Sequence, residues 1–465
     1  MHYISTRGQT PPMSFSDVLL QGLAPDGGLY LPESWPQLHL EKLKNLVKKE
    51  KSYQVLASEI IWPFMAGMIE RENLNELVER SYASFNSEEI VPTKRINDSI
   101  WLAELFHGPT LAFKDIALQL VGQLFDYQLA KSSERITIVG ATSGDTGSAA
   151  IEACRDRDAM DIVILHPHGK TSEIQRRQMT TVASSNVHNI AIEGNFDDCQ
   201  NLVKAMFLDP EFSEKIKMSG VNSINWARVM AQIVYYWWAS INVADGEKVE
   251  FCVPSGNFGN VFAGFGAHQT GLPISRFIVA SNSNNVLDRF FRTGSMEART
   301  VSPTLSPSMD IQISSNFERL LFEVLDRNGE KVNLLLSQFR ESGLFTIDTP
   351  TLDDFKKKWT SSCVNDHKTL ETIAYIYEET GELIDPHTAV GVTAAIEKQG
   401  ETSCPIICLA TAHPSKFPEA VKAATGIQTE LPPSLEGLLE KEENFTVIPN
   451  DLNTVQEFIL SKITD

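Results

Sequence analysis

Cysteines, basic residues and long hydrophobic runs are all scarce in this sequence of 465 residues. Its six cysteines are scattered, whereas a disulfide-stabilised domain is small and has closely paired cysteines, so we expect reduced and mostly buried thiols. The most apolar stretch, residues 233–244, is shorter than the roughly 20 residues that span a bilayer and contains Asn242. Residues 1–13 lack the apolar core of a secretory signal. We therefore expect a cytoplasmic protein with no membrane partner.

Positive charge is also in short supply. The chain has 40 Lys and Arg side chains against 60 Asp and Glu side chains, which gives a formal net charge of −20. Such a chain repels phosphate backbones over most of its surface, so nucleic acid is not an expected partner. An anionic small molecule would have to be bound by a local cluster of hydrogen-bond donors.

The length exceeds the roughly 250 to 300 residues at which one hydrophobic core stops growing, so more than one domain is expected. We expect an accessory or lid domain at 1–95, which begins with turn residues and continues with helical spacing. From residue 96 to 465 short β-branched runs alternate with amphipathic segments, a pattern typical of an α/β sheet. The predicted strands are 136–139, 162–165, 189–192, 250–253, 277–280 and 406–410, and the predicted helices are 115–129, 146–156, 172–181, 197–207, 225–241 and 317–325.

The segment GATSGDTGS (residues 140–148) directly follows a predicted strand and opens a helix. Its glycines, hydroxyls and backbone amides suit a carboxylate or a phosphate, because the first amides of a helix point at an anion. It is not a P-loop, since no Gly-Lys-Ser/Thr ending follows. An ordinary helix capped by Ser or Thr fits the spacing equally well.

A second glycine-rich segment, PSGNFGN (residues 254–260), also follows a predicted strand. Glycine lets the backbone approach a ligand closely, and the amides of the next helix suit a phosphate dianion. A single Gly-x-x-Gly is weak evidence for a phosphate site. Two such segments after strands of one α/β chain are stronger evidence for anion-binding loops.

The third segment, HGPTLAFKD (residues 107–115), places Lys114 behind apolar residues at the start of a helix. A lysine at the edge of an apolar pocket loses solvation, so its pKa falls and its amine becomes suited to Schiff-base chemistry. Most lysines at helix starts are simply solvated. From this segment alone, a solvated Lys114 is the stronger interpretation and a nucleophilic Lys114 is the weaker one.

Taken together, the motifs resemble the threonine synthase family of pyridoxal-phosphate enzymes, which have the tryptophan synthase β-like fold. Two amino-terminal segments, STRG and APDGGLYLP, resemble that family's first domain, so the resemblance covers nearly the whole chain. It implies two open, mostly parallel sheets flanked by helices, the fold of type II pyridoxal-phosphate enzymes, with a small amino-terminal domain. Five ordered motifs carry it: HGPTLAFKD, ATSGDTG (141–147), NSINWAR (222–228), PSGNFGN and ATAHPSKF (410–417).

The resemblance implies cofactor-binding roles for eight residues. Lys114 would form the Schiff base with pyridoxal 5′-phosphate and act as the catalytic acid and base. Thr411 would face the pyridine nitrogen, and Asp145 would lie beside the phenolic oxygen, which it would repel unless one of the two is protonated. The loop that holds the cofactor's phosphate would be Gly256, Asn257, Phe258, Gly259 and Asn260.

The same resemblance implies the substrate-binding residues. Thr142, Ser143 and Thr146 match the loop that binds the substrate's carboxylate. The substrate's phosphate would be bound by Asn222, Ser223 and Arg228. Arg228 is the most informative of these, since a planar guanidinium holds a phosphate with two hydrogen bonds, although a salt-bridged arginine on a helix is the alternative.

The activity that the resemblance implies is a carbon–oxygen lyase reaction that converts O-phospho-L-homoserine and water to L-threonine and phosphate. The enzymatic alternative is a phospho-lyase of the same fold that acts on phosphohomoserine or phosphothreonine. A non-catalytic binding protein that retains the fold is the alternative from another class. A homo-oligomer is a further expectation.

Other conspicuous residues have simpler interpretations. His166 and His168 have the spacing of metal ligands but lack a third ligand, so we expect a strand-end loop and no metal site. Aromatic residues at 235–238 would pack in the core or at a subunit interface. Residues 385–388 would cap a helix at 389–396, with Pro386 in the first turn, and the resemblance implies that His387 lies near the site. Residues 302–315 are loop-like and a candidate lid.

Overall fold

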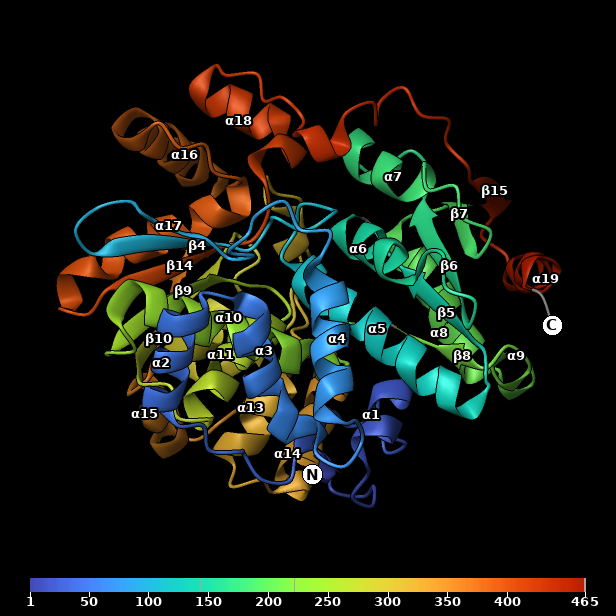
Figure 1. Ribbon diagram of the computed structural model, residues 1–465, viewed down its shortest axis with the longest axis horizontal. Coiled ribbons are helices and arrows are strands. Elements are labelled where there is room, and N and C mark those ends of the chain that lie inside the picture. The colour runs from blue at the N-terminus through green and yellow to red at the C-terminus, as the bar shows by residue number, and fades with distance from the viewer. Residues whose placement is uncertain (143, 221, 464–465) are drawn as a thin grey trace.

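Two open sheets form the framework of the protein (Figure 1). The structure is a computed structural model that describes residues 1–142, 144–220 and 222–463. The six-stranded sheet lies on the left of Figure 1, and the five-stranded sheet lies on the right. No helix among the described residues has the length and apolarity needed to cross a membrane.

The larger sheet is parallel except at one edge. Its strand order is β13 (Trp359–Cys363), β10 (Ile274–Ser281), β9 (Val249–Pro254), β14 (Ile406–Ala410), β4 (Ile100–Glu104) and β3 (Thr93–Arg95). Only β3 runs antiparallel to its neighbour. Because β9 and β14 are adjacent, the segments that follow their carboxyl ends meet at one edge.

All neighbouring strands of the smaller sheet are parallel. Their order is β15 (Thr446–Pro449), β7 (Val187–Glu193), β6 (Met160–Pro167), β5 (Ile136–Ala141) and β8 (Met218–Ser219). Every residue of β6 is buried, as expected for a parallel strand with helices on both faces. The predicted fold class is confirmed.

In the described part of the chain, seven helices between residues 114 and 269 pack around the two sheets. They are α5 (Lys114–Ser132), α6 (Asp145–Cys154), α7 (Glu173–Thr180), α8 (Phe196–Leu208), α9 (Pro210–Lys215), α10 (Trp226–Ala244) and α11 (Gly259–Gln269). The later helices are α12 (Val286–Thr293), α13 (Phe317–Val324), α14 (Gly329–Ser342), α15 (Thr349–Lys356), α16 (Asp366–Thr380), α17 (Pro386–Lys398), α18 (Pro418–Thr425) and α19 (Leu452–Lys462). All six predicted helices and all six predicted strands are present, with their ends shifted by up to three residues.

The first 95 residues contain four helices and a two-stranded antiparallel sheet. The strands are β1 (Tyr3–Ser5) and β2 (Tyr30–Pro32), and the helices are α1 (Phe15–Gln21), α2 (Leu40–Glu50), α3 (Tyr53–Ile61) and α4 (Arg71–Tyr82). They share one hydrophobic core with α5 and α10. Tyr53 of α3, for example, packs edge-on against Trp238 of α10 with ring centroids 5.7 Å apart.

Three simpler expectations can be checked here. All six cysteines are free, and four of them are buried. The aromatic residues at 235–238 are buried in the core, as predicted. The loop expected around the histidine pair is wrong for His166, which lies within β6 and packs against Phe445, because this buried strand extends to Pro167.

Candidate active site

The loop before α5 is held in one conformation by Asp115. Thr110 donates to the Asp115 carboxylate through its backbone N–H (2.9 Å) and its hydroxyl (2.6 Å). Burial raises the pKa of Asp115 to about 6, despite these hydrogen bonds. A Cβ added at Gly108 would lie 2.4 Å from the Asp115 Cβ, so only glycine fits there. The start of α5, where Lys114 lies, is therefore fixed.

Lys114 faces Asp145, the first residue of α6. The Lys114 Nζ lies 3.7 Å from the Asp145 Oδ2, and the Lys114 side chain is 11% exposed. Burial lowers the pKa of Lys114, and although Asp145 opposes this shift, the positive charges of Lys416 and Arg228 add to it. The amine is thus more readily deprotonated than an exposed lysine, which is the state that attacks a carbonyl carbon.

Sequence reasoning missed Lys416, although it lies within the ATAHPSKF motif. The Lys416 side chain is fully buried in the 3-10 turn Pro414–Lys416, and its Nζ lies 2.8 Å from the Asp145 Oδ1. It also donates to the Thr110 carbonyl (2.7 Å), while Gln175 donates to the Asp145 Oδ1 (2.7 Å). No pattern in the sequence shows that a lysine after a proline turn points inward.

These contacts determine the charge of Asp145. Burial alone would raise the pKa of the carboxyl, but Lys416, Lys114 and the hydrogen bond from Gln175 outweigh burial and hold the pKa well below its usual range. Asp145 is therefore a carboxylate at neutral pH. Its negative charge is compensated by the two lysines that lie near its oxygens.

The glycine loop between β9 and α11 presents backbone amides and no basic side chain. Phe258 has a φ of +62°, a left-handed turn, and its N–H donates to the Ser255 hydroxyl (3.1 Å). A Cβ at Gly256 would lie 3.0 Å from Ile311, and one at Gly259 would lie 3.2 Å from the Asn316 Nδ2. The loop is thus a close-fitting cradle at the amino-terminal end of α11.

Tyr235 and Tyr236 orient the side chain of Asn260. Both hydroxyls donate to the Asn260 Oδ1, at 2.6 and 3.0 Å. The Asn260 Nδ2 is buried and has no hydrogen-bond partner among the described residues. An unpartnered donor beside free helix amides suits an anion, so the loop fits the phosphate of pyridoxal phosphate.

In the loop after β5, the Thr142 hydroxyl holds the loop itself. Its oxygen accepts hydrogen bonds from the backbone N–H groups of Gly144 and Gly147, both at 3.1 Å. Thr146 is half-buried in the first turn of α6. Ser143, the third residue predicted to bind the substrate's carboxylate, lies outside the described residues. The shape of this loop therefore depends on Thr142.

The NSINWAR segment leads into α10. Asn225 caps this helix by accepting from the Ala227 N–H (3.0 Å), and its Nδ2 donates to the Leu19 carbonyl (2.9 Å). Arg228, in the first turn, is 3% exposed, and burial lowers its pKa to about 10. Asn222 is exposed, and the Ser223 carbonyl lies 3.8 Å from the position that a Cβ on Gly259 would occupy. The NSINWAR segment and the glycine loop thus adjoin each other.

Thr411 is brought to Lys114 by pairing between distant segments. The Phe113 N–H donates to the Thr411 carbonyl (2.9 Å), and Ala112 and Ala412 form an antiparallel bridge. The Thr411 N–H donates to the hydroxyl of Thr388 (3.3 Å), in the first turn of α17. Thr411, the predicted partner of the pyridine nitrogen, is therefore paired with Phe113, the residue directly before Lys114.

His387 positions a loop. Asp385 caps α17, as predicted, and lies 2.8 Å from the His387 Nδ1. The His387 Nε2 accepts from the Ser308 N–H (3.1 Å), so the proton of the ring is on Nδ1. This bond fastens the loop at 302–315, and Ser314 in that loop donates to the Gly256 carbonyl (2.7 Å).

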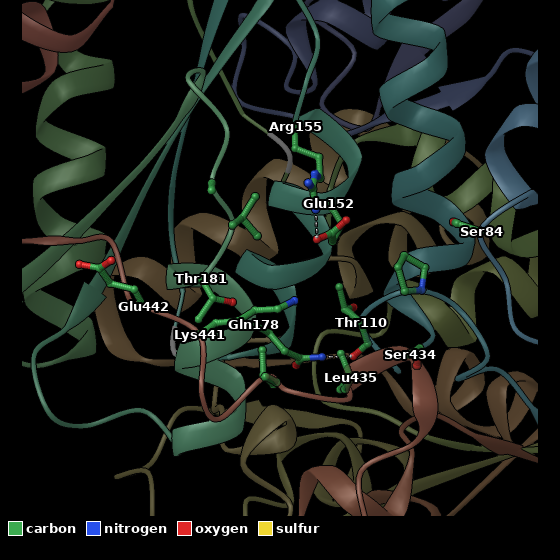
Figure 2. Close-up of a pocket in the computed structure, with 14 residues that line it drawn as sticks. Ser84, Thr110, Glu152, Arg155, Gln178, Thr181, Ser434, Leu435, Lys441 and Glu442 are labelled. Carbon is green, nitrogen blue, oxygen red and sulfur yellow. Dashed lines mark hydrogen bonds and ion pairs between the residues drawn. The ribbon is translucent and has the colours of Figure 1, made fainter.

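A cavity of about 680 Å³ is lined in part by Thr110, Gln178, Glu152 and Arg155 (Figure 2). Gln178 donates to the Thr110 carbonyl at one end, and Glu152 pairs with Arg155 at the other. Glu152 lies seven residues beyond Asp145, or about 10 Å along α6. The Glu152 end of the cavity is thus distant from Asp145, whereas its Thr110 end adjoins Lys416, which donates to the same Thr110 carbonyl.

Among the described residues, no cluster of three or more His, Cys, Asp or Glu side chains could hold a metal ion. The buried lysine, the two loops at helix starts and the two sheets define a fold type II pyridoxal-phosphate-dependent enzyme. The family model described as pyridoxal-phosphate dependent enzyme matches residues 88–335. The models for the threonine synthase N terminus and for threonine synthase, C-terminal, match residues 2–82 and 388–459. The chain belongs to the threonine synthase family.

Relatives in that family match over the whole chain. The threonine synthase of Pseudomonas aeruginosa is 52% identical over 99% of this chain and 98% of its own. The solved structure of pyridoxal-phosphate-bound threonine synthase from Brucella melitensis is 48% identical, covers 99% of both chains and has a TM-score of 0.96. The yeast threonine synthase structure is 40% identical, with a TM-score of 0.93 and coverage of 99% and 98%.

Proposed function

We propose that the protein converts O-phospho-L-homoserine and water to L-threonine and inorganic phosphate. The observation that carries the proposal is the position of the Lys114 amine, buried beside Asp145 and within the electrostatic influence of Arg228. Family membership supports the same activity, since the relatives are named threonine synthase.

The proposed cofactor site is formed by the glycine loop, Lys114 and Thr411. Gly256, Asn257, Phe258, Gly259 and Asn260 would hold the phosphate of pyridoxal phosphate through amides and the free Asn260 Nδ2. When bound, the cofactor supplies an electron sink that stabilises negative charge on an amino-acid carbon. Thr411, a hydroxyl partner, would leave the pyridine nitrogen largely unprotonated.

Lys114 would anchor the cofactor through its amine and then serve as the acid and base. Its depressed pKa favours the free amine, which can take a proton from the substrate's α-carbon and return one at the γ-carbon. Asp145 stays ionised between Lys114 and Lys416. Because Asp145 already has two lysine partners, its charge is compensated beside the cofactor's phenolic oxygen.

The substrate would be held at both ends. Arg228, with Asn222 and Ser223, would bind the phosphate, which leaves from the γ-carbon. Thr142, Ser143 and Thr146, with the amides at the start of α6, would hold the carboxylate. Because the loop that binds the substrate's phosphate adjoins the glycine loop, both phosphates would lie at the same end of the site.

One reaction separates this proposal from its alternatives. Purified protein given pyridoxal phosphate and O-phospho-L-homoserine should release phosphate and threonine in equal amounts, and Lys114→Ala should lose at least about 10²-fold in rate. Equal phosphate and 2-oxobutyrate without threonine would identify the phospho-lyase. A protein that takes up no cofactor would be the non-catalytic binding protein.

Three expectations stay predictions. The division of the chain near residue 95, a homo-oligomeric assembly and a cytoplasmic location each follow from sequence reasoning. The net charge of −20 likewise supports, as an inference, the absence of a nucleic-acid partner.

A further inference from the structure

Asn316 is a fully buried side chain that sequence reasoning did not select. It directly precedes α13, is 0% exposed, and its backbone N–H donates to the carbonyl of Asn257 in the glycine loop (3.1 Å). The Asn316 Nδ2 lies 3.2 Å from the position that a Cβ on Gly259 would occupy, and the Ser223 carbonyl lies 3.8 Å from that position. Asn316 therefore lies where the two predicted phosphate-binding loops meet.

Only one of the two polar atoms of the Asn316 side chain has a hydrogen-bond partner among the described residues. Its Oδ1 accepts a hydrogen bond from the Arg319 Nη1. Its Nδ2 is buried and has no hydrogen-bond partner among the described residues. A buried donor without a partner is destabilising, so its retention calls for an acceptor that the protein itself does not supply.

Arg319 fixes the direction of that amide. Its side chain is fully buried, with the guanidinium 5.9 Å from the centroid of the Trp226 ring. Its Nε donates to the Tyr30 carbonyl (3.0 Å), and its Nη2 donates to the Ile224 carbonyl (2.5 Å). Since the Nη1 holds the Asn316 Oδ1, the Nδ2 must point away from Arg319.

We propose that Asn316 is a further binding residue of the active site, which donates its Nδ2–H to a phosphate oxygen above the amino-terminal end of α11, and that Arg319 is its positioning residue. The acceptor is an anion because the cradle already presents helix amides and the unpartnered Asn260 Nδ2, which are all donors. The phosphate belongs either to the cofactor or to the substrate. A substrate phosphate rests on the proposed function.

The test replaces the donor and keeps the shape. Asn316→Asp retains an oxygen for Arg319 but puts a carboxylate oxygen where the NH₂ group was. Asn189→Asp is the control for a new buried carboxylate away from the site, because Asn189 is also buried and lies in β7, where its Nδ2 donates to the Met179 carbonyl (3.0 Å). For each protein, three dissociation constants are measured: pyridoxal phosphate and pyridoxal with the apoprotein, and inorganic phosphate with the holoenzyme.

If Asn316 binds the cofactor's phosphate, the dissociation constant of pyridoxal phosphate rises about 10- to 100-fold in Asn316→Asp, while that of pyridoxal changes less than about twofold. If it binds the substrate's phosphate, the constant for inorganic phosphate rises by the same factor, and that for pyridoxal phosphate does not. Neither measurement needs turnover, so both stay interpretable if the proposed reaction is wrong.

The proposal is overturned if neither phosphate-dependent constant changes more than in Asn189→Asp, or if pyridoxal binding weakens as much as pyridoxal phosphate binding. Circular dichroism shows whether the variant folds, and Asn316→Ala, with an expected loss of about tenfold, replaces it if it does not. Arg319→Lys should weaken the same constant, and in the Asn316→Ala background it should add little further loss.

Discussion

At the scale of single residues, two buried lysines share one carboxylate. Lys416 contacts the Asp145 Oδ1 at 2.8 Å, whereas Lys114 stands 3.7 Å from the Oδ2. The closer lysine compensates the charge of Asp145, which leaves the Lys114 amine free to react. Lys114 and Lys416 thus have different roles at the same carboxylate.

We predict that Lys416→Met slows the capture of pyridoxal phosphate by the apoprotein several-fold at pH 7. Burial lowers the pKa of Lys114, and Lys416 lowers it further while also occupying Asp145. Removing Lys416 raises the pKa of Lys114 on both counts, so less free amine is present at neutral pH. The measurement is the rate of cofactor binding against pH, followed by absorbance.

Lys131→Met is the control for that experiment, since it makes the same change at an exposed lysine near the far end of α5, the helix that begins with Lys114. The pH at half-maximal rate should move upward in Lys416→Met alone. A profile that stays in place or moves downward would contradict the assigned division of roles.

We predict that substituting Arg228 weakens the binding of the substrate but not that of the cofactor. Arg228→Lys keeps the charge but loses the planar pair of donors, so the KM for the phosphorylated substrate should rise about 10- to 100-fold. The dissociation constant of pyridoxal phosphate should change less than about twofold. Steady-state kinetics and a cofactor titration measure the two, and equal losses in both would mean that Arg228 has only a structural role.

The sequence motifs identified residues at or near the starts of predicted helices, such as Lys114, Asp145 and Arg228. They did not identify Lys416, Asn316 or the role of Tyr235, because each of these acts through a contact with a distant segment. Tyr235, for example, was correctly assigned to the core, but its hydroxyl reaches Asn260 only once α10 packs on α11. Burial that is created by tertiary packing leaves no local pattern.

At the scale of elements, the site is assembled from helix starts. Lys114 begins α5, Asp145 begins α6, Gly259 begins α11, and Arg228 lies in the first turn of α10. Hydrogen bonds to Asp115, Thr142 and Ser255 connect described residues of the loops before α5, α6 and α11. The capping residues of these helices should therefore influence binding as well as stability.

Asn225→Ala tests this idea, because Asn225 caps α10 and also ties it to Leu19. We expect a loss of about 1 kcal/mol or more in the free energy of unfolding and a higher KM for the phosphorylated substrate, since Arg228 follows three residues later. Asn328→Ala removes the same kind of cap from α14, outside the site. Chemical denaturation and kinetics should show that the control loses stability alone. A KM that is unchanged in Asn225→Ala would contradict the link.

Sequence periodicity predicted the buried parallel strands well, since a strand covered on both faces is a short apolar run between turns. It gave no bounds for several other elements, among them β8, which has two residues, and α11, whose glycines and phenylalanines give little helical signal. The loop at 302–315 stays a candidate lid, and the structure connects it to the site through the Ser308 N–H and the Ser314 hydroxyl.

At the scale of the whole molecule, the proposed cofactor site takes residues from the loops of both sheets. Asp145 follows β5 of the smaller sheet, whereas the glycine loop and Thr411 follow β9 and β14 of the larger one. A ligand bound to all of them must stabilise both sheets together. Pyridoxal phosphate at 100 times its dissociation constant should add about 2.7 kcal/mol to the free energy of unfolding.

Thermal scans of the apoprotein, with and without pyridoxal phosphate, measure that coupling. We predict one transition that moves upward by a few degrees, and a smaller shift in Lys114→Ala at the same cofactor concentration. Two transitions, of which the cofactor moves only one, would show that the sheets unfold independently of the site.

The central claim is that Lys114, and no other lysine, is covalently joined to the cofactor. The most direct test reduces the holoenzyme with borohydride and locates the labelled lysine by peptide mapping. The account predicts a stable adduct in the peptide that contains Lys114. An adduct on Lys416, the other lysine that contacts Asp145, or on any other lysine would contradict it.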